Sequence, residues 1–258
     1  MITDITSSSN SIFKNTKKLL NASDRKKSRQ FIVEGYRSVS DAIKHGADIE
    51  YIIISESYNL DTFQMCNRTY RLSDKLFSEL SATVNSQGII AVADFLKHSE
   101  IDFDKCSNFV YLDSVTDPGN MGTILRTCDA MGADGVILSK GCVDVYNPKV
   151  VRATMASLFC VPLYFDNDDT MVSMLKQKGF CIVGTVLDGS ISSFESDLTP
   201  KTVIVMGNEA NGISQKIKDM CDTKLRVPMS GGAESLNVAV CCSMLLYEKS
   251  RQTYFAEV

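Results

Sequence analysis

The sequence predicts an α/β protein of two domains, the second of which is built on a parallel sheet covered by helices. The chain has 258 residues, which suits two domains because single domains cluster near roughly 100 to 150 residues. Beyond residue 107, apolar strand-length segments alternate with segments of helix length, the pattern of a parallel sheet buried on both faces. A polar, charged stretch at residues 96–106 is the expected linker.

Residues 1–95 are expected to form a small α/β domain. Strands are predicted in RQFIVEG and IEYIIISES, and the YRSVSDAIKHG segment between them predicts a helix that ends at Gly46. This strand-helix-strand unit makes the first domain a separate, smaller structure.

Residues 107–258 are expected to form the second domain. Its predicted strands are NFVYLDSV, DGVILSK, VPLYF, FCIVGTV, KTVIVMG and KLRVPM. Ligands of such sheets bind outside the carboxyl ends of the strands. The loops of interest therefore begin at Asp113, Thr185, Gly207 and Pro228.

The composition is that of a globular protein, with 44% hydrophobic and 22% charged residues. No apolar run reaches the roughly 18 residues of a membrane span, and the MITDITSSSN start lacks a secretory pattern, so we expect a cytoplasmic protein without a membrane partner. The nine cysteines include no CxxC pair and are expected to be mostly buried thiols. The two histidines lie apart from any cysteine or acidic cluster, which argues against a metal site.

Charge gives a mixed indication about nucleic acid. The net charge of −4 argues mildly against it. One N-terminal stretch is nonetheless strongly basic, with Asp24 as its single acid. Its cations are Lys14, Lys17, Lys18, Arg25, Lys26, Lys27 and Arg29. Such a run indicates either an RNA-binding face or a solvated helix face.

The first unusual loop is DPGNMGTILRTCDAMG, at residues 117–132. Asn120 suits a helix N-cap and Gly132 the residue that follows a helix, with an apolar stripe of helical period between them. Arg126 points away from that stripe, which is compatible with solvation or with a role at the mouth of the loop.

The second is VIVMGNEANGIS, at residues 203–214, where a buried strand runs into two glycines around a polar NEAN. It resembles a phosphate-cradling loop except that Ile213 occupies the lysine position. Nucleoside triphosphate hydrolysis is therefore a poor fit, and a different adenosine-bearing ligand is preferable. No GxGxxG is present, which weakens a dinucleotide-dependent oxidoreductase.

The third is LRVPMSGGAESLNVAVCCSMLLYEKSRQ, at residues 225–252. A strand stops at Pro228, a Gly-rich loop follows, and Ser235 is predicted to cap a helix that is apolar almost all round. Such a helix is expected to be buried, so Asn237 in its first turn should need a hydrogen-bond partner.

Together these residues resemble the three signature motifs of the SpoU (TrmH-like) RNA 2′-O-ribose methyltransferases of the SPOUT superfamily. The matching residues are Asn120-x-Gly122-x-x-x-Arg126, Gly207-Asn208-Glu209, and Pro228-Met229 followed by Ser235-Leu236-Asn237-Val238. The likeness spans residues 110–252, and FIVEGYRSVSDAIKHG resembles the start of that family's ribosomal-protein-like substrate-binding domain. Cys128, Cys241 and Ala210 depart from residues common in the family, but none removes a polar group.

The resemblance implies a C-terminal trefoil knot and S-adenosylmethionine as the methyl donor, bound by three loops. The residues implied in cofactor binding are Thr185, Leu187, Met206, Gly207, Asn208, Val227, Met229 and Leu236. It also implies a homodimer with active-site groups from both chains, and an RNA substrate. Ribosomal RNA is favoured over transfer RNA because of the extra N-terminal domain.

By resemblance Arg126 is the central catalytic residue. Because an arginine pKa lies above about 12, binding of RNA phosphate and stabilisation of the emerging alkoxide are preferred to the action of a base, which stays open. Ser235 and Asn237 would orient the arginine or the RNA, Asn120 would hold the ribose or its phosphate, and Glu209 would brace its loop or pair with arginine. Two alternatives remain: a non-catalytic RNA-binding or ribosome-assembly module, and a knotted methyltransferase acting on an RNA base.

Overall fold

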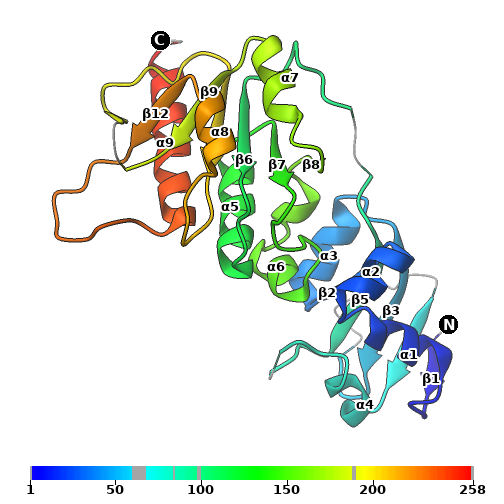
Figure 1. Cartoon of the computed structure of the whole chain (residues 1–258). Coiled ribbons are helices and arrows are strands. Elements are labelled where there is room, and N and C mark those ends of the chain that lie inside the picture. Colours follow the sequence, from blue (N-terminus) through cyan, green and yellow to red (C-terminus); the bar gives the residue numbers. More distant parts are fainter. Residues whose placement is uncertain (1, 60–67, 84, 98–99, 188–189, 257–258) are drawn as a thin grey trace. The chain divides into compact units, whose positions relative to one another are not determined.

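The chain packs into two compact units. The computed structural model describes residues 2–59, 68–83, 85–97, 100–187 and 190–256. One unit comprises Met1–Lys97 with Asp144–Phe159, and the other His98–Val143 with Cys160–Val258 (Figure 1). Both contain a sheet and covering helices, so the α/β class expected from the sequence is confirmed.

The first unit is built on a five-stranded mixed sheet in the order β1-β4-β3-β5-β2. Its strands are β1 (Ile2–Ile5), β2 (Gln30–Glu34), β3 (Ile49–Ser55), β4 (Thr69–Leu72) and β5 (Ile89–Asp94). Strand β5 lies between β2 and β3 and runs antiparallel to both. The two strands of the predicted strand-helix-strand unit are therefore not direct neighbours.

Four helices belong to the N-terminal part of this unit: α1 (Ser11–Lys18), α2 (Ala22–Ser28), α3 (Tyr36–Lys44) and α4 (Asp74–Ser78). One face of the sheet, with Ile32, Ile53 and Val92, packs against Phe13 of α1 and Phe77 of α4. Helix α3 contacts β2 and β5. The sheet is therefore buried between helices. These helices fix its strands, and with them the side chains at the strand ends.

The segment Asp144–Phe159 packs with the first unit, although it lies between two strands of the second in sequence. It contains α6 (Pro148–Ala153) and a 3-10 turn, Ser157–Phe159. The Phe31 ring of β2 lies 4.8 Å from the Tyr146 ring between centroids, and the Arg25 guanidinium donates to the Asp144 carboxylate at 2.7 Å. From the sequence this segment is expected in the second domain. Its contacts with the first unit are of long range, and patterns along the chain do not reveal such contacts.

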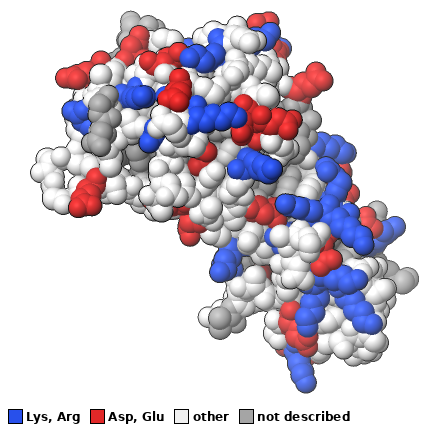
Figure 2. Space-filling model, viewed as in Figure 1, with Lys and Arg blue, Asp and Glu red and all other residues white. Residues whose placement is uncertain are grey.

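The basic N-terminal stretch forms α1, α2 and the turn that follows. Arg25 is 1% exposed and pairs with Asp144, so it is a structural residue rather than part of a cationic surface. The remaining cations are exposed: Lys14, Lys17, Lys18, Lys26, Lys27 and Arg29. Figure 2 shows lysine and arginine side chains gathered on this part of the first unit.

The second unit is built on a seven-stranded sheet, parallel throughout, in the order β10-β12-β9-β11-β6-β7-β8. Its strands are β6 (Asn108–Leu112), β7 (Gly135–Ser139), β8 (Leu163–Asp166), β9 (Cys181–Thr185), β10 (Ile191–Ser192), β11 (Thr202–Met206) and β12 (Thr223–Arg226). All six predicted strands are present. The two-residue β10 was not predicted, because it is too short to show a pattern.

Helices cover both faces of this sheet. They are α5 (Pro118–Ala130), α7 (Met171–Gln177), α8 (Gln215–Met220) and α9 (Val238–Ala256). Phe109, Tyr111 and Val205 face a core completed by Val172 of α7 and Ile217 of α8. Helices α5 and α9 contact each other (Figure 1), so the helices that carry the first and third signature motifs lie side by side.

The order of the strands changes direction between β6 and β11, because β7 and β8 lie on one side of β6, and β11, β9 and β12 lie on the other. A parallel sheet is expected to bind ligands at such a point. The knot implied by the resemblance stays a prediction. No helix among the described residues is long and apolar enough to span a membrane.

Candidate active site

Two loops meet where the sheet order reverses, one after β6 and one after β11. The buried Asp113 carboxylate accepts a hydrogen bond from the Ser214 amide at 2.7 Å, and the Asn208 side chain donates to the Ser114 carbonyl at 2.9 Å. Each loop therefore holds the other in place. Parallel pairing of β6 with β11 brings both loops to one edge of the sheet.

The loop after β11 is a tight turn between Gly207 and Gly212. Asn208 and Gly212 exchange two backbone hydrogen bonds, of 2.8 and 2.9 Å, and the Asn208 Oδ1 atom accepts from the amides of Ala210 and Asn211. A Cβ on Gly207 would overlap the backbone of Gly212. Only glycine therefore fits at 207, whereas Ile213, in the position of a phosphate-binding lysine, is buried in the core.

Glu209 fastens this turn to the start of α5. Its Oε1 atom accepts from the Asp117 amide and the Asn120 side chain, both at 3.0 Å, and its Oε2 atom accepts from the amide and hydroxyl of Thr116. Partial burial raises the pKa of the Glu209 carboxyl, but the donors outweigh this effect and hold the pKa at about 2. Glu209 is thus an ionised brace, and no ion pair joins it to an arginine among the described residues.

Asn120 joins all three signature motifs. It donates to Glu209 through Nδ2 and accepts from the Asn237 Nδ2 atom at 2.8 Å through Oδ1. The expected N-cap role of Asn120 is wrong: α5 begins at Pro118, and the Asp117 side chain caps it by accepting from the Asn120 amide. Because Asp117 satisfies the backbone there, the Asn120 side chain is available to the site.

Asn237, rather than Ser235, caps α9. Its Oδ1 atom accepts from the amides of Ala239 and Val240, and α9 begins at Val238. Asn237 is exposed, so the expectation that burial forces it to find a partner is also wrong. It is held instead by its own cap and by Asn120. Ser235 lies in the exposed loop before the cap.

A cavity of about 640 Å³ opens beside these residues. It lies in the size range of small-molecule sites, roughly 300 to 1,000 Å³. Its lining includes all eight residues expected to bind the cofactor, namely Thr185, Leu187, Met206, Gly207, Asn208, Val227, Met229 and Leu236. Glu209, Ser235 and Asn237 also line it. The loops after β9, β11 and β12 thus meet at one cavity.

Sequence reasoning missed several residues of the lining. Ile213, Lys218, Lys224 and Arg226 border the cavity but belong to no signature motif. Among the described lining residues the two lysines and the arginine supply positive charge, and the one acid among them, Glu209, is already engaged. Their positions in and beside α8 and β12 become apparent only once β12 is known to pair with β9.

Arg126 lies outside the cavity lining. It is exposed on α5, later in the helix than Asn120, and makes no hydrogen bond or ion pair with the described residues. Its guanidinium is therefore available to a ligand approaching from solvent. The structure brings Asn120, Glu209 and Asn237 together. Arg126 follows Asn120 in the same helix but has no partner among the described residues.

One thiol, that of Cys241, belongs to the described lining of the cavity. Burial raises the pKa of the Cys241 thiol to about 11, so it is neutral at pH 7. Cys128 and Cys242 are buried, Cys160 is exposed and the other described cysteines are intermediate, so the thiols are less uniformly buried than expected. Cys66 lies outside the described residues. Among the described residues, no group of three acids, histidines or cysteines could hold a metal ion.

Comparison with known families gives two matches. Residues 107–247 match the SpoU rRNA methylase family, and residues 10–91 match the MRM3-like substrate binding domain. The first match covers more than half of the chain and includes every residue of the cavity described above.

Two characterised relatives are similar over most of their length. The chain is 33% identical to the 23S rRNA (guanosine(2553)-2′-O)-methyltransferase RlmP of Bacillus subtilis, over 94% of this chain and 97% of RlmP. It is 31% identical to the 23S rRNA (uridine(2479)-2′-O)-methyltransferase of Streptomyces viridochromogenes, over 90% of this chain and 86% of that protein. These two enzymes modify different nucleosides.

Solved structures agree over nearly the whole chain. The AdoMet-bound rRNA methyltransferase of Sinorhizobium meliloti superposes with a TM-score of 0.87 at 29% identity, covering 97% of this chain and 98% of that one. The SpoU methyltransferase AviRb of Streptomyces viridochromogenes, in complex with AdoMet, superposes with a TM-score of 0.85 at 30% identity, covering 95% and 98%. The SPOUT fold expected from the resemblance is confirmed.

Proposed function

The chain belongs to the SpoU rRNA methylase family, and we propose that it methylates the 2′-hydroxyl of one ribose in 23S ribosomal RNA. It is an S-adenosylmethionine-dependent RNA 2′-O-methyltransferase. The choice of 23S RNA is supported by the relatives from Bacillus subtilis and Streptomyces viridochromogenes, which act on that RNA. Because they modify a guanosine and a uridine, the base at the target is left open. A cytoplasmic location would follow from such a substrate.

One observation carries the proposal: Glu209 and Asn237, which line the 640 Å³ cavity, are joined by hydrogen bonds through Asn120, which lies behind that lining. These three side chains come from three distant parts of the sequence and are held by two bonds, of 3.0 and 2.8 Å. A fixed polar group beside a cofactor cavity is what positioning of a ribose hydroxyl requires.

The cavity fits S-adenosylmethionine. Leu187, Met206, Val227, Met229 and Leu236 offer apolar surface for a flat adenine ring, and the turn at Gly207 and Asn208 brings backbone groups to the lining. When bound, the cofactor supplies an electrophilic sulfonium methyl group. The positive charge of Lys218, Lys224 and Arg226 is suited to its carboxylate.

The protein's own groups then act on the RNA. As the ribose 2′-oxygen attacks the methyl carbon, the bond from that carbon to sulfur would break and the hydroxyl proton would pass to water. Developing negative charge on the oxygen would be stabilised by a nearby guanidinium. We assign that role to Arg126, which is exposed and unpaired in the described structure. Asn120 and Ser235 would hold the ribose or its phosphate, and Asn237 and Glu209 would keep Asn120 in position.

We assign RNA capture to the first unit, whose residues 1–95 form the proposed substrate-binding domain, and methyl transfer to the second unit, which comprises His98–Val143 and Cys160–Val258. The match of residues 10–91 to a substrate binding domain supports this. So do the exposed cations of α1 and α2, because clustered lysines bind phosphates. The buried Arg25 takes no part.

We propose a homodimer formed through α9. From Val238 to Leu246 this helix is apolar almost all round, yet Val240, Met244 and Tyr247 are 43%, 46% and 64% exposed. They are spaced so as to share one helix face. An apolar face of this kind usually marks an interface. Because Val238 and Cys241 of the same helix line the cavity, a second copy there would lie close to the site.

The decisive experiment is methyl transfer from labelled S-adenosylmethionine to ribosomal RNA taken from cells that lack this protein. Label is expected in 23S RNA, in a dinucleotide that resists alkaline cleavage, because a 2′-O-methyl group blocks that cleavage. Label recovered in an alkali-sensitive nucleotide would indicate base methylation instead. Cofactor binding without transfer to any RNA would indicate a non-catalytic module.

A further inference from the structure

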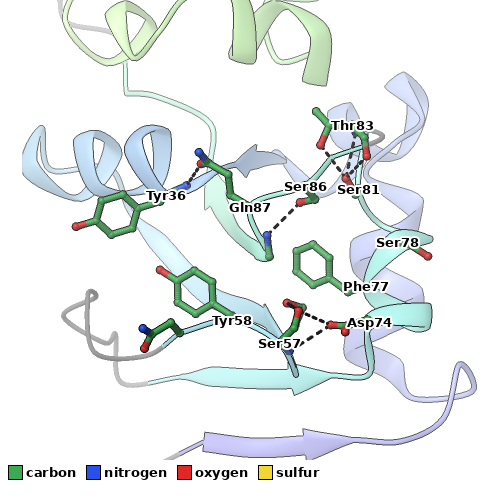
Figure 3. A pocket seen from close by; sticks show the side chains of 13 residues that line it. Tyr36, Ser57, Tyr58, Asp74, Phe77, Ser78, Ser81, Thr83, Ser86 and Gln87 are labelled. Carbon is green, nitrogen blue, oxygen red and sulfur yellow. Dashed lines mark hydrogen bonds between the residues drawn. The ribbon is translucent and has the colours of Figure 1, made fainter.

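The first unit contains a second cavity, of about 520 Å³, that takes no part in the proposed methyl transfer. It lies between the start of α3, the end of β3, α4 and the loop before β5 (Figure 3). The lining consists of Tyr36, Ser55, Ser57, Tyr58, Asn59, Asp74, Phe77, Ser78, Ser81, Thr83, Ser86, Gln87 and Gly88. All of these residues belong to one unit, so the cavity is complete within it.

The lining combines aromatic rings, uncharged hydrogen-bonding groups and one carboxylate, Asp74, which accepts from the Ser57 amide and hydroxyl. Tyr36, Tyr58 and Phe77 lie around the same space in Figure 3, and Tyr36 is 40% exposed. Among the lining residues there is no lysine or arginine. A phosphate is therefore a poor occupant, because phosphate sites use cationic side chains. A flat, uncharged ring with polar edges fits this chemistry.

The polar groups are held in fixed positions. The Gln87 Oε1 atom accepts from the Tyr36 amide at 2.8 Å, which orients the Nε2 donor of the same amide. Glu34, behind the wall, accepts from the hydroxyls of Ser81, Thr83 and Ser86. The Gln87 Nε2 group is therefore a preorganised donor, and the three hydroxyl oxygens, whose hydrogens are donated to Glu34, are fixed acceptors. Fixed groups of this kind recognise the edge of a ligand with little loss of entropy.

The cavity also depends on the absence of a side chain at Gly88. A Cβ there would approach the Ser55 hydroxyl oxygen to 2.5 Å, and the residue has a φ of +74°, which favours glycine. The Tyr58 hydroxyl is buried and has no hydrogen-bond partner among the described residues.

We propose that this cavity receives an unpaired nucleobase of the RNA substrate. The inference rests on the proposed function, and adds that the first unit reads a base in addition to binding phosphates. Proteins recognise RNA sequence mainly in loops and bulges, where splayed bases stack on aromatic rings and pair through their edges. Tyr36 supplies an accessible ring, and Gln87 supplies a fixed amide donor.

Binding of short labelled RNAs to the full-length protein tests this. The probes are ten-nucleotide single strands of A, C, G or U and a ten-base-pair duplex, measured by fluorescence anisotropy. At least one single strand should bind more tightly than the duplex. Tyr36→Ala should weaken that binding between about fivefold and a hundredfold, the range of one base-aromatic stack, and leave duplex binding unchanged.

Gln87→Glu provides the sharper variant. It keeps the oxygen that accepts from the Tyr36 amide, so α3 stays anchored, but replaces the amide donor by a carboxylate. The preference among the four strands should change. Gln30→Ala is the matched control, because Gln30 lies in β2 of the same unit, outside the cavity lining. It should bind every probe as the wild type does.

The result that would overturn the proposal is equal binding of duplex and all single strands, or unchanged affinities in both cavity variants. Methyl transfer to ribosomal RNA separates this failure from failure of the proposed function. If the wild type methylates the RNA and both variants retain its KM and kcat, the base pocket is wrong and the function stands. If the wild type transfers no methyl group, the function is wrong. A higher KM at unchanged kcat in the variants supports the pocket.

Discussion

The Nδ2 atom of Asn237 donates to the Oδ1 atom of Asn120 at 2.8 Å, which connects the N-cap of α9 with the first turn of α5. The Nδ2 atom of Asn120 in turn donates a hydrogen bond to Glu209, in the turn after β11. Glu209 and Asn237, which line the cavity, are therefore connected through Asn120, and losing one of the three residues should displace the others.

Replacing Asn120 by aspartate should disable the site while preserving its shape. The new carboxylate would face Glu209, 3.0 Å from the present donor, and two carboxylates at that distance repel. We expect kcat to fall by about a hundredfold, comparable to the loss of one preorganised donor. Radiolabelled methyl transfer to ribosomal RNA measures this. Thr123→Ala, at an exposed position of the same helix, is the control and should be active. Full activity of Asn120→Asp would contradict the positioning role.

Glu209 should make stability depend on pH in the acid range. Its pKa is held at about 2, below the ordinary value of 4.5, mainly because donors from Asn120 and the backbone outweigh the effect of burial. A depressed pKa contributes stability above the unfolded pKa, and that stability is lost as pH falls towards the folded pKa. Glu209→Gln should therefore be less stable than the wild type at pH 6. The difference should shrink between about pH 4.5 and 2, as followed by thermal melting. A difference that does not vary with pH would exclude this role.

Arg126→Ala should slow methyl transfer strongly without weakening the binding of the cofactor. The side chain is exposed and lies outside the cavity lining, so S-adenosylmethionine should bind with unchanged affinity by calorimetry. Loss of a charge that stabilises the transition state costs about a hundredfold to a thousandfold in kcat. Arg126→Lys, which keeps the charge but not the planar fork, should be intermediate. Near wild-type methylation by Arg126→Ala would make the assignment wrong.

Neutralising Lys26 and Lys27 should reduce the salt dependence of RNA binding. Both side chains are exposed on α2. Each phosphate contact adds roughly 0.7 to 0.9 to the slope of log affinity against log salt. Lys26→Gln with Lys27→Gln should lower that slope by about 1.5, measured by filter binding at several salt concentrations. Lys105→Gln, at an exposed position in the other unit, serves as the control. An unchanged slope in the double variant would show that α2 does not bind RNA.

Met244→Glu should separate the proposed dimer. The Met244 side chain is 46% exposed between Val240 and Tyr247 on α9, and an unpaired charge buried in an apolar interface is strongly unfavourable. Light scattering after size exclusion should report one protomer instead of two. Met155→Glu is a matched control, because Met155 is 45% exposed and belongs to the other unit. If the wild type is already monomeric, the exposed face of α9 has another role.

Much of this protein can be predicted from its sequence, because its strongest patterns are local. The six apolar segments of the second unit all form strands, and the eight residues expected at the cofactor all line one cavity. The two predicted N-caps, Asn120 and Ser235, are wrong by a few residues, because Asp117 caps α5 and Asn237 caps α9. Pro118 is the signal that identifies Asp117 as the cap of α5, because proline favours the first helical position.

The remaining differences are of long range. Strands β1, β4 and β5 complete the first sheet through pairings between distant segments, and periodicity within a segment does not specify a partner. The burial of Arg25 depends on Asp144, 119 residues away. The bonds between Asn120 and its two partners span 89 and 117 residues, so the motifs indicate the participants but not their contacts.

The packing of Asp144–Phe159 with β2 has a consequence for the order of events during synthesis. Domains usually fold one after another as a nascent chain leaves the ribosome. Here the first unit would remain incomplete until Phe159 has emerged, since the ring that stacks on Phe31 and the carboxylate that neutralises Arg25 are translated later than β6 and β7. The first unit is therefore completed only after part of the second unit has been synthesised.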